Sequence, residues 1–113
     1  MKPSEDLKSG VIRILEDYKA TDIREYDISE RTALADWFVI ATGEADRHIE
    51  AMAEGLRMAF KDAPGRAREG SGESGWLLVD LGDVIVHLFT VAQRQYYDLD
   101  QLWLAVAQGR LPE

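Results

Sequence analysis

The sequence contains no cysteine and comparatively few basic residues, and each shortage excludes a class of protein. Without cysteine the chain has neither a disulfide framework nor a thiolate metal site, and it gives no sign of secretion. Its 21 acidic residues outnumber its 13 basic ones, which leaves a formal charge of -8 at pH 7. Such a chain repels nucleic-acid phosphate, whose binding depends largely on Lys and Arg, so no direct sequence-specific nucleic-acid contact is expected.

Long apolar runs are also missing. The longest span only about half a dozen residues, far short of the roughly 20 that a membrane-spanning helix needs. The first residues, Met-Lys-Pro-Ser-Glu-Asp, lack the apolar centre of a signal peptide. We therefore expect a cytoplasmic protein with no membrane partner.

The length of 113 residues and the hydrophobic share of 46% predict one folded domain over residues 1–113. We expect its core to span 5–105, followed by a short C-terminal extension at 106–113. Four of the nine glycines lie in 63–75, which we interpret as a mobile loop within the domain.

The spacing of apolar residues predicts the element order α-β-β-α-β-β-α. Apolar residues recur at helical spacing in 4–20 and 44–63, and one or two short helices are expected in 92–110. Alternation and β propensity predict strands at 21–28, 36–43, 76–81 and 83–90. This order is typical of the α/β class, of the α+β type, with one mixed β-sheet flanked by helices.

The segment "GWLLVDLGDVIVHLF", residues 75–89, predicts a hairpin with two unlike faces. If Leu81-Gly82 forms the tip, Asp80 opposes Asp83 and Trp76 opposes His87, and opposed side chains share a face. A three-residue loop would instead shift the pairing and turn one strand over. The aliphatic face then carries Leu77, Val79, Val84, Val86 and Leu88. The mixed face carries Trp76, Leu78, Asp80, Asp83, Ile85, His87 and Phe89.

The mixed face admits two interpretations. Asp80 and Asp83 could hold a divalent cation with His87 as a further ligand, as in a metal-dependent, nucleotidyltransferase-like enzyme. However, the sequence has no Gly-rich phosphate loop ending in Gly-Lys-Ser/Thr. The simpler interpretation is that the aspartates cap a turn and that His87 lies on a half-buried face. We therefore expect no catalytic residue, no metal and no cofactor.

Trp76 favours a binding surface instead. Tryptophan covers about 150–250 Å² when buried, and interface hot spots are enriched in Trp, Tyr and Arg. Further along, the segment "RQYYDLDQLW" contributes Tyr97 and Trp103, which could close the core or build a dimer contact. Arg94 could pair with an acid of the mixed face or belong to a second contact.

Four segments together resemble one known family. They are "DWFVIATGEADRHIEAMAE", the "EG" at 69–70, "GWLLVDLGDVIVHLF" and "RQYYDLDQLW". In order and spacing they are similar to the ribosomal silencing factors, also called the Iojap family, from about Thr21 to Trp103. One departure is at Glu44, Ala45 and Asp46, where the family commonly has small polar residues.

The resemblance implies a non-enzymatic role. Members bind the large ribosomal subunit through its fourteenth protein, near the face that meets the small subunit. They prevent subunit joining and so repress translation when nutrients are limiting. Their fold is similar to that of nucleotidyltransferases, and they often form homodimers. The acidic balance suits a basic ribosomal protein as partner. We expect the contact to centre on Trp76, Asp80, Asp83 and His87, with Glu69 on the loop edge.

Overall fold

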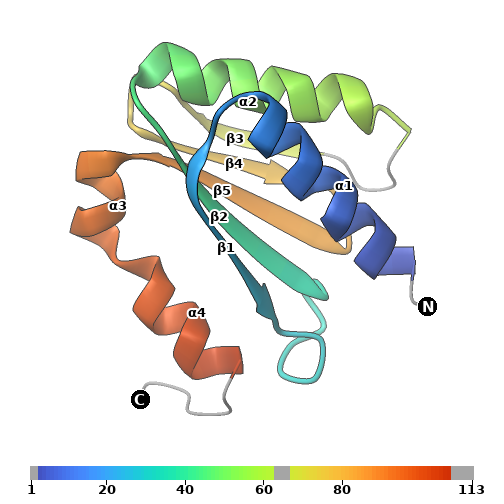
Figure 1. Cartoon of the computed structure of the whole chain (residues 1–113). Helices are drawn as coiled ribbons and strands as arrows, with labels where there is room; N and C mark the ends of the chain where they lie inside the picture. The colour runs from blue at the N-terminus through green and yellow to red at the C-terminus, as the bar shows by residue number, and fades with distance from the viewer. Residues whose placement is uncertain (1–2, 63–66, 108–113) are drawn as a thin grey trace.

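The computed structural model describes residues 3–62 and 67–107 (Figure 1). The elements in these ranges are α1 (Pro3–Asp17), β1 (Thr21–Asp27), β2 (Trp37–Gly43), α2 (Asp46–Ala59), β3 (Ala67–Ser71), β4 (Trp76–Asp80), β5 (Val84–Thr90), α3 (Val91–Tyr97) and α4 (Leu99–Ala107). No helix in the described ranges has both the length and the apolar character needed to span a membrane.

The five strands form one sheet in the order β1-β2-β5-β4-β3. β2 and β5 run parallel, and every other neighbouring pair is antiparallel. The predicted mixed sheet is therefore confirmed. β5 is the central strand, and six of its seven residues are buried. A strand covered on both faces needs apolar side chains at nearly every position, which explains the run Val-Ile-Val-His-Leu-Phe.

The two faces of the sheet are covered differently. α1 and α2 lie across one face, and α3 and α4 lie at the opposite side (Figure 1). The predicted aliphatic face packs under α1 and α2, together with Leu15, Met52 and Leu56 of these helices. On the other face Phe38 and Ile85 form a smaller cluster, against which Leu102 and Trp103 of α4 pack. The mixed face is therefore covered by α4 over part of its area.

The interpretation of residues 63–75 as a loop is wrong for 67–71, which form the edge strand β3. β3 pairs antiparallel with β4, so that Glu69 lies opposite Leu78. Its first four residues are exposed, and it therefore shows no apolar alternation to detect. Glu50 of α2 secures its end, because Gly72 N–H donates to Glu50 Oε2 at 2.6 Å. Residues 63–66 lie outside the described residues.

The C-terminal prediction also changes at its boundary. One or two short helices were expected in 92–110, and the structure has two, α3 and α4. Residues 106 and 107 belong to α4, while 108–113 of the expected extension lie outside the described residues. The observed order is thus α-β-β-α-β-β-β-α-α, with one strand more than the sequence predicts.

The predicted register of the β4–β5 hairpin is wrong by two residues. Trp76 lies opposite Phe89 rather than His87, and Asp80 lies opposite Ile85 rather than Asp83. The tip is Gly82-Asp83, because Leu81 N–H donates to the carbonyl of Val84 at 2.9 Å. Gly82 has a φ of 88°, which suits the first central position of a primed hairpin turn.

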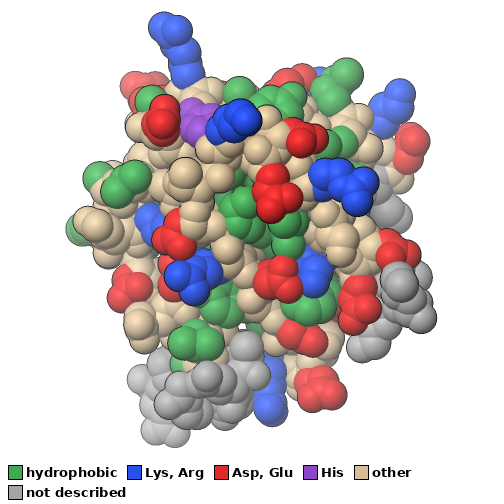
Figure 2. Space-filling view, viewed as in Figure 1, with side chains coloured by type: hydrophobic (Ala, Val, Ile, Leu, Met, Phe, Trp, Pro, Cys, Tyr) green, Lys and Arg blue, Asp and Glu red, His purple; other side chains and the backbone are tan. Residues whose placement is uncertain are grey.

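A shift of two residues leaves every strand side chain on its predicted face, whereas a shift of one would have turned a strand over. Trp76, Leu78, Asp80, Ile85, His87 and Phe89 therefore still share a face. Only Asp83 leaves it, because it lies in the turn. Elsewhere, on the side seen in Figure 2, acidic and basic side chains are interspersed rather than gathered into one patch.

Candidate functional site

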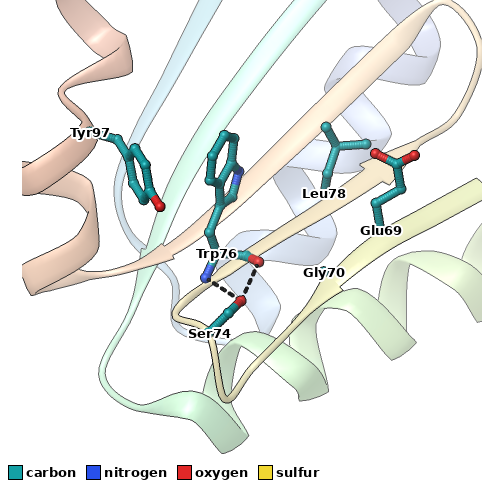
Figure 3. A pocket seen from close by; sticks show the side chains of 6 residues that line it. All are labelled: Glu69, Gly70, Ser74, Trp76, Leu78 and Tyr97. Carbon is teal, nitrogen blue, oxygen red and sulfur yellow. Dashed lines mark hydrogen bonds between the residues drawn. The ribbon is translucent and has the colours of Figure 1, made fainter.

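An aromatic cluster occupies the mixed face where β4 begins and α3 ends. We define it as Trp76, His87, Phe89 and Tyr97. The Trp76 ring stacks on Phe89, with centroids 5.2 Å apart and planes at 24°. Tyr97 of α3 lies on another side of Trp76, at 4.7 Å and 51° (Figure 3). Trp76 is half-buried and Tyr97 is 44% exposed, so the cluster reaches the surface.

His87 lies beneath this surface, since it is only 4% exposed. Trp76 Nε1 donates a hydrogen bond to His87 Nδ1 at 3.3 Å, and Phe38 meets the imidazole edge to face. Burial lowers the pKa of His87 to about 4, so the ring is neutral at pH 7. The neutral ring can accept this bond at Nδ1. His87 therefore acts on the surface through Trp76, whose indole edge it fixes.

The low pKa of His87 predicts acid-dependent stability. The unfolded chain binds a proton at this histidine below about pH 6.5, whereas the folded chain does so only below about pH 4. Between these values the unfolded state binds more protons, so the free energy of unfolding falls as the pH falls. We expect a loss of about 3 kcal/mol between pH 7 and pH 4 from this group.

Urea unfolding of the wild type and of His87→Phe across this pH range measures the effect. The difference between the two proteins isolates the histidine from the carboxylates that also titrate near pH 4. The wild type should lose stability relative to the variant as the pH falls from 6.5 to 4. Parallel pH profiles for the two proteins would contradict the assignment.

The two aspartates are not brought together. Asp80 is half-buried, and its Oδ1 accepts a hydrogen bond from Gly82 N–H at 2.8 Å, so it caps the turn as the simpler interpretation expects. Asp83 is exposed in the turn, and its backbone carbonyl accepts from the N–H groups of Asp36 and Trp37. Over residues 3–62 and 67–107, no group of three or more His, Cys, Asp or Glu side chains is placed to hold a metal ion.

A depression of about 280 Å³ opens beside Trp76 (Figure 3). Its lining comes from four places: β3, the β3–β4 turn, β4 and α3. The lining residues are Glu69, Gly70, Ser74, Trp76, Leu78 and Tyr97. Glu69 lies on strand β3 rather than on a loop, and its side chain projects from the same face as Trp76 and Leu78.

Gly70 and Ser74 are the residues of this site that sequence reasoning missed, whereas the sequence already places Leu78 on the mixed face. Gly70 has a φ of 85°, and a Cβ there would collide with the backbone carbonyl of Trp76. The lack of a side chain at this position therefore lets β3 approach β4 closely beside Trp76. The segment Glu-Gly-Ser-Gly at 69–72 hints at a special backbone position. Because it was not assigned to a strand, the sequence alone could not place it beside Trp76.

Arg94 does not pair with an acid of the mixed face, which corrects that expectation. It is 8% exposed, and its Nε and Nη2 donate to the carboxylate of Asp100 on α4, each at 3.0 Å. Its Nη1 donates to Thr42 Oγ1 at 2.8 Å and to the carbonyl of Asp22. Arg94 therefore ties α3 and α4 to β1 and β2 from inside the protein.

Asp100 is the acidic centre of this network. Burial raises its pKa, but hydrogen bonds from Arg94 and Tyr26 outweigh burial and hold the pKa below its usual value. Trp103 joins the same helix to the sheet, since its ring lies 4.3 Å from that of Phe38. Of the three residues considered for a second contact, Tyr97 alone is exposed, while Arg94 and Trp103 pack α3 and α4 onto the sheet.

Fold and site together define a class: an α+β protein with a five-stranded mixed sheet and an aromatic cluster that reaches the surface on the face opposite α1 and α2. The profile of the family described as "Ribosomal silencing factor during starvation" matches residues 1–113. The chain belongs to the ribosomal silencing factor family.

Individual relatives agree with this assignment. The chain is 39% identical over 103 residues to "Ribosomal silencing factor RsfS" of Chromobacterium violaceum, covering 88% of this chain and 83% of that protein. It is 31% identical over 98 residues to mouse "Mitochondrial assembly of ribosomal large subunit protein 1", covering 82% of this chain and 43% of that protein. A crystal structure of a Chromobacterium violaceum protein superposes with a TM-score of 0.83 at 36% identity, covering 90% and 87% of the two chains.

Proposed function

We propose that this protein binds the large ribosomal subunit and sterically prevents the small subunit from joining it. The direct contact in this proposal is the fourteenth protein of the large subunit, a basic protein, and the outcome is repressed translation under nutrient limitation. The observation that carries the proposal is the half-buried Trp76, set between Tyr97 and Glu69 on one face of the sheet. Family membership supports the same role.

The chemistry of this surface supports a basic protein as partner. Trp76 and Tyr97 offer large rings with few rotatable bonds, which is the composition of interface hot spots. Glu69 of β3 lies beside them, while Asp80 stands at the far end of β4 and Asp83 at the hairpin tip. With a net charge of -8, the whole chain would attract a cationic partner and speed its association.

Occupying a subunit interface requires no bond to be made or broken, and in our proposal the protein acts without catalysis. Among the described residues, no observation favours metal-dependent nucleotidyl transfer, because its two carboxylates, Asp80 and Asp83, are not opposed. From the family resemblance we also propose that the free protein forms homodimers in the cytoplasm. Tyr97 is the best placed of the earlier candidates for such a contact, since it is 44% exposed.

Sedimentation with purified ribosomal subunits tests the proposal. The protein should pellet with isolated large subunits, and adding it before small subunits should lower the fraction of joined ribosomes in a dose-dependent way. Glu16→Lys changes an exposed residue of α1, across the sheet from the site. This surface variant serves as the control and should behave as the wild type does. Unchanged subunit joining at saturating protein would overturn the steric role.

A further inference from the structure

We propose that the depression beside Trp76 receives an arginine side chain of the partner. This inference rests on the proposed function, because it names the group that the same surface recognises. It commits the site to one chemistry: a planar guanidinium held between an aromatic face and a carboxylate. The depression is open to the outside and has a volume of about 280 Å³, so a side chain can enter it without rearrangement of the fold.

The strand register sets the distance between the two recognition groups. Glu69 lies directly opposite Leu78, and Trp76 lies directly opposite Ser71, so Glu69 and Trp76 are diagonal neighbours on one face. Such neighbours are roughly 7–8 Å apart, a separation that long and aromatic side chains can span. A guanidinium that lies between them can contact both. In Figure 3 the Trp76 ring has Tyr97 on one side, while Leu78 and Glu69 lie on the other.

The carboxylate of Glu69 is available for such a pair. Glu69 is exposed, and its side chain has no hydrogen bond or ion pair with any residue in 3–62 or 67–107. The adjacent Arg68 does not neutralise it, because Arg68 pairs with Glu50 of α2 on the other face of the sheet, at 2.5 Å. An incoming cation therefore meets an unpaired negative charge.

The indole is held in the orientation that the guanidinium needs. Its Nε1–H is committed to His87 Nδ1, and one of its faces stacks on Phe89. The ring can therefore receive a cation without losing a hydrogen bond of its own. Arginine fits better than lysine, because its planar guanidinium stacks on aromatic rings and forms bidentate bonds to carboxylates.

Titration of the isolated protein with small probes tests this assignment independently of ribosome binding. N-acetyl-arginine amide should shift the indole N–H resonance of Trp76 saturably. N-acetyl-citrulline amide has the same shape without the charge, and it should bind at least about fivefold more weakly. Glu69→Gln should weaken the arginine probe by a similar factor, whereas Glu73→Gln, an equal charge change in the exposed turn, should not. Equal binding of arginine and citrulline probes, or no saturable shift, would overturn the inference.

Tyr97 supplies a second test, on purified large subunits. Tyr97→Phe keeps the ring and should bind as the wild type does, whereas Tyr97→Leu keeps only apolar bulk and should bind about fivefold more weakly. Tyr97 lines the depression, so equal binding of the two variants would mean that its ring is no part of the wall that receives the guanidinium. If the wild type fails to bind large subunits, the proposed function fails, while the probe titration still decides whether the depression takes a guanidinium.

Discussion

Trp76→Ala should weaken binding to the large ribosomal subunit at least about 30-fold, which corresponds to the roughly 2 kcal/mol that defines a hot spot. The substitution removes the largest ring of the surface, whose centroid lies 4.7 Å from that of Tyr97. It also removes the donor to His87 Nδ1 and one wall of the depression. Affinity measured by sedimentation over a range of protein concentrations gives the ratio directly.

The control must separate lost contact from lost structure, because Trp76 also stacks on Phe89. Trp76→Phe retains an aromatic ring at the same position and should lose less affinity than Trp76→Ala. Circular dichroism and urea unfolding establish that both variants are folded at the assay temperature. A folded Trp76→Ala protein with wild-type affinity would remove this residue from the contact.

Asp100→Ala should lower the free energy of unfolding by about 2 kcal/mol, somewhat less than the loss of one partner of a fully buried ion pair, because Asp100 is partly exposed. Arg94 would keep Thr42 Oγ1, the carbonyl of Asp22 and the more distant Asp22 carboxylate at 3.7 Å, but its buried charge would lose both short bonds to Asp100. The Tyr26 hydroxyl would lose its acceptor at the same time. The midpoint of urea unfolding reports the loss.

An exposed ion pair provides the comparison. Glu54 pairs with Arg57 three residues later on α2, and both side chains are about half exposed. Glu54→Ala should therefore change the stability by less than about 1 kcal/mol. If Asp100→Ala proved as mild as Glu54→Ala, the Arg94 network would not be what holds α3 and α4 against the sheet.

The elements that bury apolar residues could be predicted from the sequence, and those held by polar contacts could not. α1 and α2 follow from helical periodicity, and β2, β4 and β5 follow from runs rich in apolar, β-branched and aromatic residues. β3 escaped because its first four residues are exposed and its partners are backbone groups of β4 and the carboxylate of Glu50. An exposed edge strand imposes no hydrophobic pattern on its residues.

The candidate site was predicted in composition rather than in geometry. The face shared by Trp76, Asp80 and His87 survived because the register error was two residues, but the partners across the hairpin did not. Turn geometry decided that register, and the sequence allowed Gly82 at more than one turn position. The burial of His87 and the inward direction of Arg94 depend on α3 and α4, whose position against the sheet no local pattern specifies.

The place of β5 at the centre of the sheet has a consequence for the order of folding. β5 is hydrogen-bonded to β2 on one side and to β4 on the other, and its first residue pairs with Trp37, 47 positions earlier in the chain. Forming the β2–β5 ladder therefore closes a long loop, and the entropy cost of that closure precedes the stabilising contacts. Such non-local pairing slows folding. Until β5 has been synthesised and docked, the apolar residues of β2 have a neighbouring strand on one side only. The chain therefore commits to its native topology late, with the arrival of the same strand that supplies His87 and Phe89 beneath Trp76.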